Sequence, residues 1–207
     1  MQEKQRNTNM NEQKKEEKKT GVQMTDEEIY QALKEKNLLE PPVFEEGFDE
    51  KVLVKFCQDV LHALNLGDYS VRTTPSYGIW GDCSWVKRKI RLSELLFLNS
   101  KIMKNHKEAY DTIIHEVCHA CRPLCAHGKK WKSLMEKLGC CSKRSKQAHL
   151  SVRSRIPYKF VLIDKDSNKV IKGWTRNCKK VKDFMAQNES SPKYLCMAHD
   201  GSPVDLA

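Results

Sequence analysis

Apolar residues are spaced differently in three parts of the chain, and the spacing predicts a different structure for each part. Residues 1–23 are mostly Lys, Glu, Gln and Asn, and such a segment cannot bury enough apolar surface to stay ordered. Residues 24–150 carry apolar residues mainly at helical spacing, whereas residues 151–207 change to short alternating stretches. We therefore expect a disordered charged tail over 1–23, one helix-rich domain over 24–150 and a β-rich region over 151–207.

Helices are expected at several places in the central part. A capping box of Thr25 and Glu28 opens the first, which should run to about Leu39 because Pro41 and Pro42 follow it. The others are expected over residues 48–64, 94–101, 106–121 and 128–138.

Strands are expected in two places, before the helix at residues 94–101 and after the helix at residues 128–138. Residues 69–73 and 84–93 should form strands of a small sheet. In the last part, residues 158–164, 169–176 and 193–198 have the texture of strands separated by turns. The sequence therefore predicts an α+β fold, with a helix-rich core and a small sheet, followed by a small β appendage.

The charge of the chain is concentrated in its second half. The formal net charge is +10, but residues 129–182 hold seventeen Lys and Arg against three acids, a local excess of +14. A basic segment of this size predicts binding to a polyanion, most commonly nucleic acid. The alternative is a lysine-rich surface that serves solubility alone.

Two further features concern the compartment. No run of 18 or more apolar residues occurs, and the N-terminal stretch has no apolar segment typical of a secretory signal. Nine cysteines without such a signal favour a reducing compartment, where thiols are free or bind metal. We expect an intracellular protein without a membrane partner, in the nucleus of a eukaryote or in the cytoplasm or nucleoid of a bacterium or phage-infected cell.

The stretch DTIIHEVCHACRPLCAH, residues 111–127, contains an H-E-x-x-H motif made of His115, Glu116 and His119. Four residues turn a helix by about 400°, so the two histidines project from one face, one turn apart. Two imidazole nitrogens can converge there on one zinc ion. Glu116 can take a proton from a water whose pKa the metal lowers to roughly 7.

A catalytic zinc needs a third protein ligand. His127 lies eight residues after His119 and beyond Pro123, where the chain can fold back. Glu136, on the following helix, is the alternative, but it lies off the apolar stripe of that helix. Metzincin spacing is excluded, because Cys125 stands where the third histidine of that pattern would be. We favour His127.

Cys118, Cys121 and Cys125 are rival ligands. Their C-x-x-C-x-x-x-C spacing can hold an iron–sulfur cluster or a zinc ion. Free cysteine is also often a small buried hydrophobe, and packing is the interpretation that we favour.

DTIIHEVCHA followed by HGKKWKSLMEKLG resembles the SprT-like family of zinc metalloproteases, which includes the Spartan proteins that degrade proteins crosslinked to DNA. In that family a third histidine opens an HGxxW segment, which here begins at His127. KRKIRLSELLFL resembles the strand and helix that precede the motif, while the spacer between His119 and His127 is shorter than in many members. The resemblance implies a zincin-like core in which His115, His119 and His127 bind Zn²⁺ and Glu116 is the catalytic base.

The resemblance also implies a function. We expect a zinc-dependent endopeptidase that cleaves proteins bound or crosslinked to DNA, and that contacts DNA without sequence preference. Single-stranded DNA should bind well if Tyr158 or Trp174 stacks on bases, although both aromatics can equally belong to a core. The rival interpretation is a DNA-binding or adaptor protein whose metal site is structural or inactive.

Many members of the family end in a zinc ribbon, and YLCMAHDGSP resembles its second knuckle through Cys196 and His199. The first knuckle should lie near YKFVLIDKDSNK, which has no cysteine, and Cys178 is the only other thiol nearby. A closed structural site needs four ligands. We therefore expect a degenerate, ribbon-like sheet without a second zinc ion; a remodelled site that uses Cys178 or a partner is the alternative.

Overall fold

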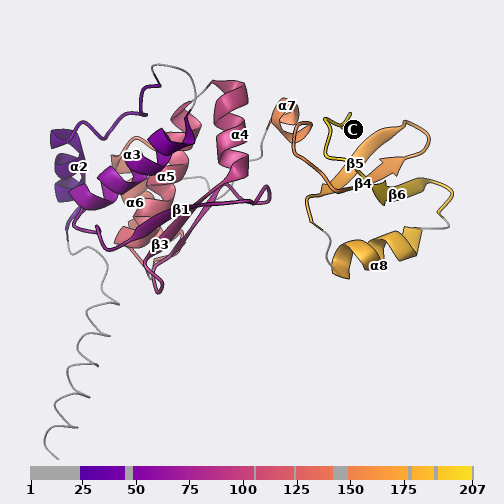
Figure 1. The fold of residues 1–207 in the computed structure, drawn as a ribbon. Helices are drawn as coiled ribbons and strands as arrows, with labels where there is room; N and C mark the ends of the chain where they lie inside the picture. Colours follow the sequence, from indigo (N-terminus) through magenta and orange to yellow (C-terminus); the bar gives the residue numbers. More distant parts are fainter. Residues whose placement is uncertain are drawn as a thin grey trace, which may run out of the picture. The chain divides into compact units, whose positions relative to one another are not determined.

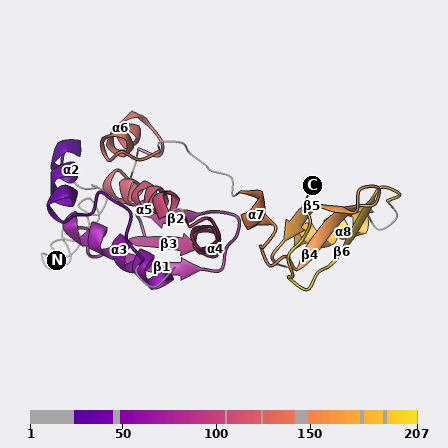
Figure 2. The ribbon, with the colours of Figure 1, turned by 90° about the horizontal axis from the view of Figure 1, so that it is seen from above.

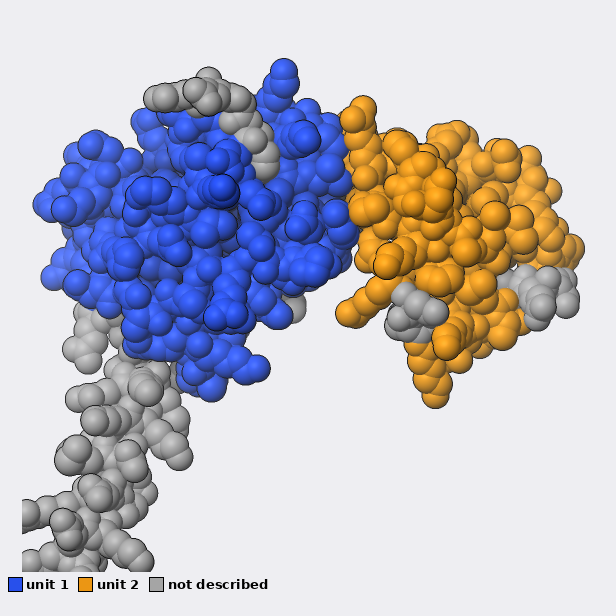
Figure 3. Space-filling model, in the orientation of Figure 1, with its two compact units in different colours: residues 1–146 blue, residues 147–207 orange. Residues whose placement is uncertain are grey.

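The computed structural model describes residues 24–44, 49–104, 106–123, 125–141, 149–176, 179–188 and 191–206. The chain folds as two compact units, residues 1–146 and 147–207 (Figure 3). Both combine helices with a small sheet, so the predicted α+β class is confirmed. The tail expected over residues 1–23 lies outside the described residues and stays a prediction.

The first unit packs helices against a three-stranded sheet (Figure 1). The sheet has the order β1-β3-β2, with β1 parallel and β2 antiparallel to β3. The strands are β1 (Ser70–Thr74), β2 (Gly81–Ser84) and β3 (Lys89–Ser93). The helices are α2 (Asp26–Glu35), α3 (Glu50–Ala63), α4 (Glu94–Met103), α5 (His106–Cys121) and α6 (Lys129–Lys137).

Helix α5 is the centre of this unit, because it packs against α3, α4, α6 and strand β2. Figure 2 shows α5 between α6 and the sheet. Its buried side chains are therefore not confined to one stripe, and they include Tyr110, Ile113 and Ile114, all with no exposed surface. Burying an aliphatic or aromatic side chain of this kind contributes roughly 1.5–3 kcal/mol. The helix that carries the H-E-x-x-H motif is thus held firmly from several sides.

Two predictions for the first unit are wrong in detail. Residues 84–93 are not one strand: β2 ends at Ser84, a turn follows, and β3 begins at Lys89. The turn requires a left-handed backbone at Arg88, with φ of 46°, which a non-glycine residue rarely adopts. Helix α2 ends at Glu35 and not near Leu39, because Asn37 takes a left-handed conformation with φ of 55° before the prolines are reached.

The second unit is built on an antiparallel sheet of order β5-β4-β6. Its elements are α7 (Leu150–Arg153), β4 (Phe160–Asp164), β5 (Lys169–Trp174), α8 (Lys179–Asn188) and β6 (Tyr194–Ala198). The three predicted strands are confirmed, but α7 and α8 were not predicted. Helix α8 packs beside β6, with Val181 fully buried and the Phe184 ring 5.4 Å from that of Trp174.

Tyr158 belongs to the core of the second unit. Only 7% of its surface is exposed, and its ring covers Gly173, where any side chain would collide with it. Tyr158 is therefore not available to stack on a base. Trp174 is partly exposed, and the Lys172 ammonium lies 5.3 Å from the centre of its ring.

Candidate metal centre

Helix α5 and the loop that follows it bring three histidines together. His115 and His119 are one turn apart on α5, and their Nε2 atoms are separated by 3.2 Å. The Nε2 atom of His127, six residues past the end of the helix, lies 3.2 Å from that of His115. The candidate ligand atoms of all three lie within 4.8 Å of one another. All three imidazoles therefore present nitrogen to one point.

This spacing fits a metal ion. Zinc–nitrogen bonds of about 2.0–2.1 Å at tetrahedral angles place two ligand nitrogens about 3.3 Å apart, close to the 3.2 Å measured here. Three neutral imidazoles are also a common donor set for a catalytic zinc with one open position. The cluster can thus hold a metal ion through His115, His119 and His127.

The loop after α5 positions the third histidine through two tight turns. The Cys125 amide donates to the Arg122 carbonyl at 3.0 Å, and the Gly128 amide donates to the Cys125 carbonyl at 2.7 Å. A Cβ atom at Gly128 would lie 2.9 Å from the Cys125 oxygen, so a side chain cannot be added there without moving the turn. Gly128 then caps α6, and His127 is held just before that helix begins.

Trp131 supports all three imidazoles from α6. Its ring centre is 4.6 Å from that of His115, 5.4 Å from His119 and 4.7 Å from His127. The side chain is fully buried. The sequence placed Trp131 on the apolar stripe of its helix and in the HGxxW segment, but its contact with every histidine of the cluster was not predicted.

Glu116 lies beside the histidines in a nearly dry environment, with 6% of its surface exposed. Burial, followed by the negative charge of Asp82, raises the pKa of its carboxyl to about 8. Strand β2 approaches it closely: a Cβ atom at Gly81 would lie 3.1 Å from the Glu116 Cγ and 3.3 Å from its Oε1. Gly81 is therefore a site residue that sequence reasoning missed, together with the strand that carries it.

The surroundings of His119 favour the neutral imidazole that a metal requires. Burial, with a smaller contribution from His127, lowers the pKa of His119 to about 4. At neutral pH this imidazole is unprotonated, so one ring nitrogen keeps a lone pair for a metal.

The rival ligands lie elsewhere. Glu136 is exposed on α6 and does not belong to the cluster. Cys118 and Cys121 are buried, and burial raises the pKa of both thiols, that of Cys121 to about 12, which disfavours the thiolate needed for a metal. Within the described residues, Cys125 belongs to no group of three or more potential ligands. Their place in the hydrophobic core supports packing as the role of Cys118 and Cys121.

The second unit shows no second cluster of potential ligands among its described residues. The Nδ1 atom of His199 accepts a hydrogen bond from the Gly201 amide at 3.1 Å, so this ring shapes the chain near β6. Cys196 lies on β6, and burial raises the pKa of its thiol. Cys178 lies outside the described residues, so the prediction of a degenerate ribbon remains untested.

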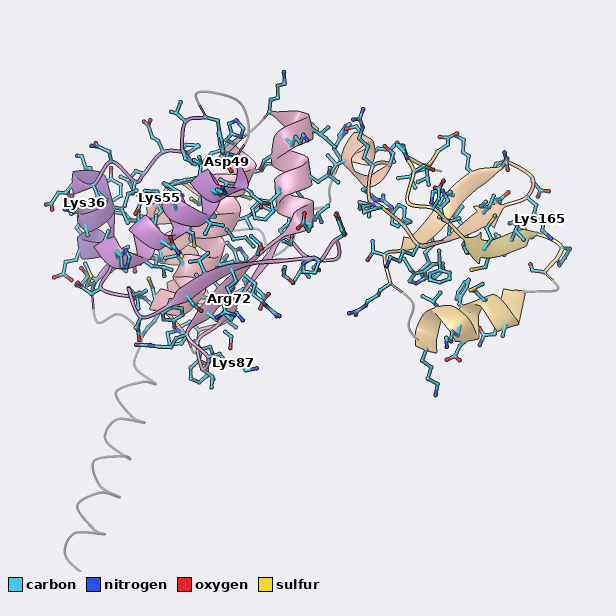
Figure 4. The ribbon with its side chains drawn as sticks, viewed as in Figure 1. Lys36, Asp49, Lys55, Arg72, Lys87 and Lys165 are labelled. Carbon is cyan, nitrogen blue, oxygen red and sulfur yellow. The ribbon has the colours of Figure 1, made fainter. Side chains whose placement is uncertain are left out.

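A hollow of about 500 Å³ lies between α3 and β1, away from the histidines. Lys55 and Arg72 line it, and Figure 4 labels both on the first unit. Its lining contains none of the residues of the histidine cluster. The hollow is therefore not part of the candidate metal centre.

Residues 50–154, half of the chain, match the model of the SprT-like family. The chain therefore belongs to the SprT-like family, a metalloprotease-type family, and the resemblance seen in its motifs is confirmed. No curated protein matches the chain. Among the described residues, no helix has the length and apolar character needed to cross a membrane.

Proposed function

We propose that this protein is a zinc-dependent endopeptidase of the SprT-like type. The observation that carries the proposal is the spacing of 3.2 Å from the Nε2 atom of His115 to those of His119 and His127, which suits a tetrahedral zinc ion. When bound, zinc would supply Lewis acidity, lowering the pKa of a water molecule and polarising a peptide carbonyl.

Glu116 is the group that would move the proton. Burial raises the pKa of its carboxyl to about 8, and the positive charge of a bound metal would lower that pKa, so that the carboxylate forms near neutral pH, where a general base is most effective. The carboxylate would accept a proton from the attacking water and return it to the leaving amine. Burial keeps bulk water from competing for that proton.

Strand β2 supports a polypeptide as the substrate. It is an edge strand of the sheet, and it packs against α5, where Gly81 approaches Glu116. An extended peptide can pair with such an edge through main-chain hydrogen bonds, which are independent of its sequence. The scissile carbonyl would then lie close to the proposed base.

Proteins bound or crosslinked to DNA are the substrates that we propose. The support is the family membership together with the excess of +14 between residues 129 and 182. Phosphate contacts by Lys and Arg give affinity without sequence preference. In the second unit, the partly exposed Trp174 ring beside Lys172 could stack on an unpaired base.

The test is cleavage of casein, with and without DNA, by wild-type protein and Glu116→Gln. We expect cleavage that EDTA abolishes and zinc restores, and a loss of about 10²–10⁴-fold in the variant, the usual worth of a general base. Metal content should not change, because the three histidines remain. If Glu116→Gln cleaves at the wild-type rate, the endopeptidase assignment is wrong.

A further inference from the structure

Helix α2 contacts residues on both sides of His127, namely Arg122 just after α5 and Ser133 on α6. It lies before residue 50, where the family match begins. It nevertheless packs against α6 and α3, and its Ile29 and Leu33 are fully buried in the core. The first residue of the helix, Asp26, makes the polar contacts that matter here.

One carboxylate oxygen of Asp26 binds the residue that follows α5. Its Oδ1 accepts from Arg122 Nη2 at 2.9 Å, and the same Nη2 also donates to the Met24 carbonyl at 2.9 Å. The Arg122 side chain is only 13% exposed, so this ion pair is largely shielded from water. Loss of the carboxylate would therefore remove a charge-assisted contact that water screens little.

The other carboxylate oxygen binds the middle of α6. Asp26 Oδ2 accepts from the Ser133 hydroxyl at 2.7 Å. Arg122 precedes His127 by five residues, and Ser133 follows it by six. One side chain thus joins the two ends of the segment that presents the third histidine.

We propose that Asp26 is a positioning residue for the metal centre, which ties α5 to α6 and so fixes the His127 imidazole toward His115 and His119. The inference rests on the proposed metal site. A histidine on a loop that is already fixed loses less conformational entropy when it binds a metal. The contacts of Asp26 with Arg122 and Ser133 should therefore raise metal affinity. Groups that hydrogen-bond the ligands directly commonly change metal affinity by about 10–100-fold, and Asp26 acts one contact further away, through Arg122 and Ser133.

The test is a cobalt titration of the metal-free full-length protein, followed by the visible absorption of Co²⁺. Asp26→Asn has the same shape as the native side chain but lacks the charge that binds Arg122. We expect it to raise the cobalt dissociation constant about tenfold, the lower end of that range. Ser133→Ala removes only the second contact and should raise the constant by a smaller factor.

Two controls on the same helix separate positioning from stability. Glu27→Gln weakens the ion pair with Lys137, 2.5 Å long and largely exposed, and should leave the cobalt constant within twofold. Ile29→Val loosens the packing of α2 without touching Asp26, so it should lower the thermal midpoint of the metal-free protein but not the cobalt affinity.

The outcomes are distinguishable. A cobalt constant for Asp26→Asn within twofold of wild type, or one that changes equally in Ile29→Val, would overturn the proposal. Wild-type protein that binds cobalt, but cleaves no casein when loaded with zinc, would refute the proposed peptidase. The cobalt constants of the variants would still decide the role of Asp26. Wild-type protein that binds no cobalt would overturn both.

Discussion

The two units have sheets of the same size but use them differently. In the first, α5 is surrounded by three helices and a strand, and this burial shifts the pKa of Glu116 upward and that of His119 downward. In the second, α8 packs on one side of the sheet, and its described lysines are exposed at the surface. Burial makes side chains reactive in one unit, whereas exposure keeps charges available in the other.

The largest effect should come from the third histidine, which belongs only to the first unit. His127→Ala removes one of three donors, and we expect both metal occupancy and casein cleavage to fall to near background. Glu136→Ala is the matched control, because that carboxylate is exposed on α6 and lies outside the cluster. Zinc content by mass spectrometry and cleavage rate decide it, and the opposite pattern would move the third ligand onto α6.

Removing the second unit should weaken DNA binding and leave the metal centre intact. A chain truncated after Lys146 should keep its metal and lose most of its affinity for DNA, because residues 147–182 hold ten Lys and Arg against two acids, +8 of the excess of +14. For the full-length protein, log affinity should fall with log salt by about 0.7–0.9 per phosphate contact. Fluorescence anisotropy over a salt series measures both chains. Salt-insensitive binding, or unchanged binding after truncation, would mean that the basic segment is only a solvated surface.

A smaller effect should follow from a methyl group beside Glu116. In Gly81→Ala the added carbon would lie 3.1 Å from Glu116 Cγ and 3.2 Å from the Arg91 carbonyl, so the carboxylate must move. We expect kcat to fall by about tenfold, since a small misplacement of a catalytic group is costly. Metal content should stay unchanged.

Gly78→Ala is the control for this change, because a Cβ atom there meets no atom within 4 Å. Steady-state kinetics of both variants are sufficient. Equal rates for Gly81→Ala and wild type would show that Glu116 needs no room beside β2.

The sequence was most informative where one local pattern decides the structure. The i, i+4 spacing of His115 and His119 places both on one helical face, and the proline-ended helix allowed His127 to return. Strand β2 was missed because the turn before Arg88 lacks the Gly or Asn that usually marks a hairpin.

Other features were missed for different reasons. Helix α8 carries Val181, Phe184 and Met185 at helical spacing, so a signal was present, but it lies among strand-like stretches. The contact of Asp26 with Arg122 joins residues 96 positions apart, and no local pattern encodes such a pair. The burial of Tyr158 was also not predictable from a local pattern, because its ring packs over Gly173, fifteen residues away along the chain.

The most direct test of the account is the zinc X-ray absorption spectrum of the purified full-length protein. We expect one zinc per chain with nitrogen ligands at about 2.0–2.1 Å and no sulfur at about 2.3 Å. In His127→Ala, any remaining zinc should show fewer imidazole ligands. Zinc bound through sulfur, or protein that retains no zinc at neutral pH, would contradict a metal centre built from His115, His119 and His127.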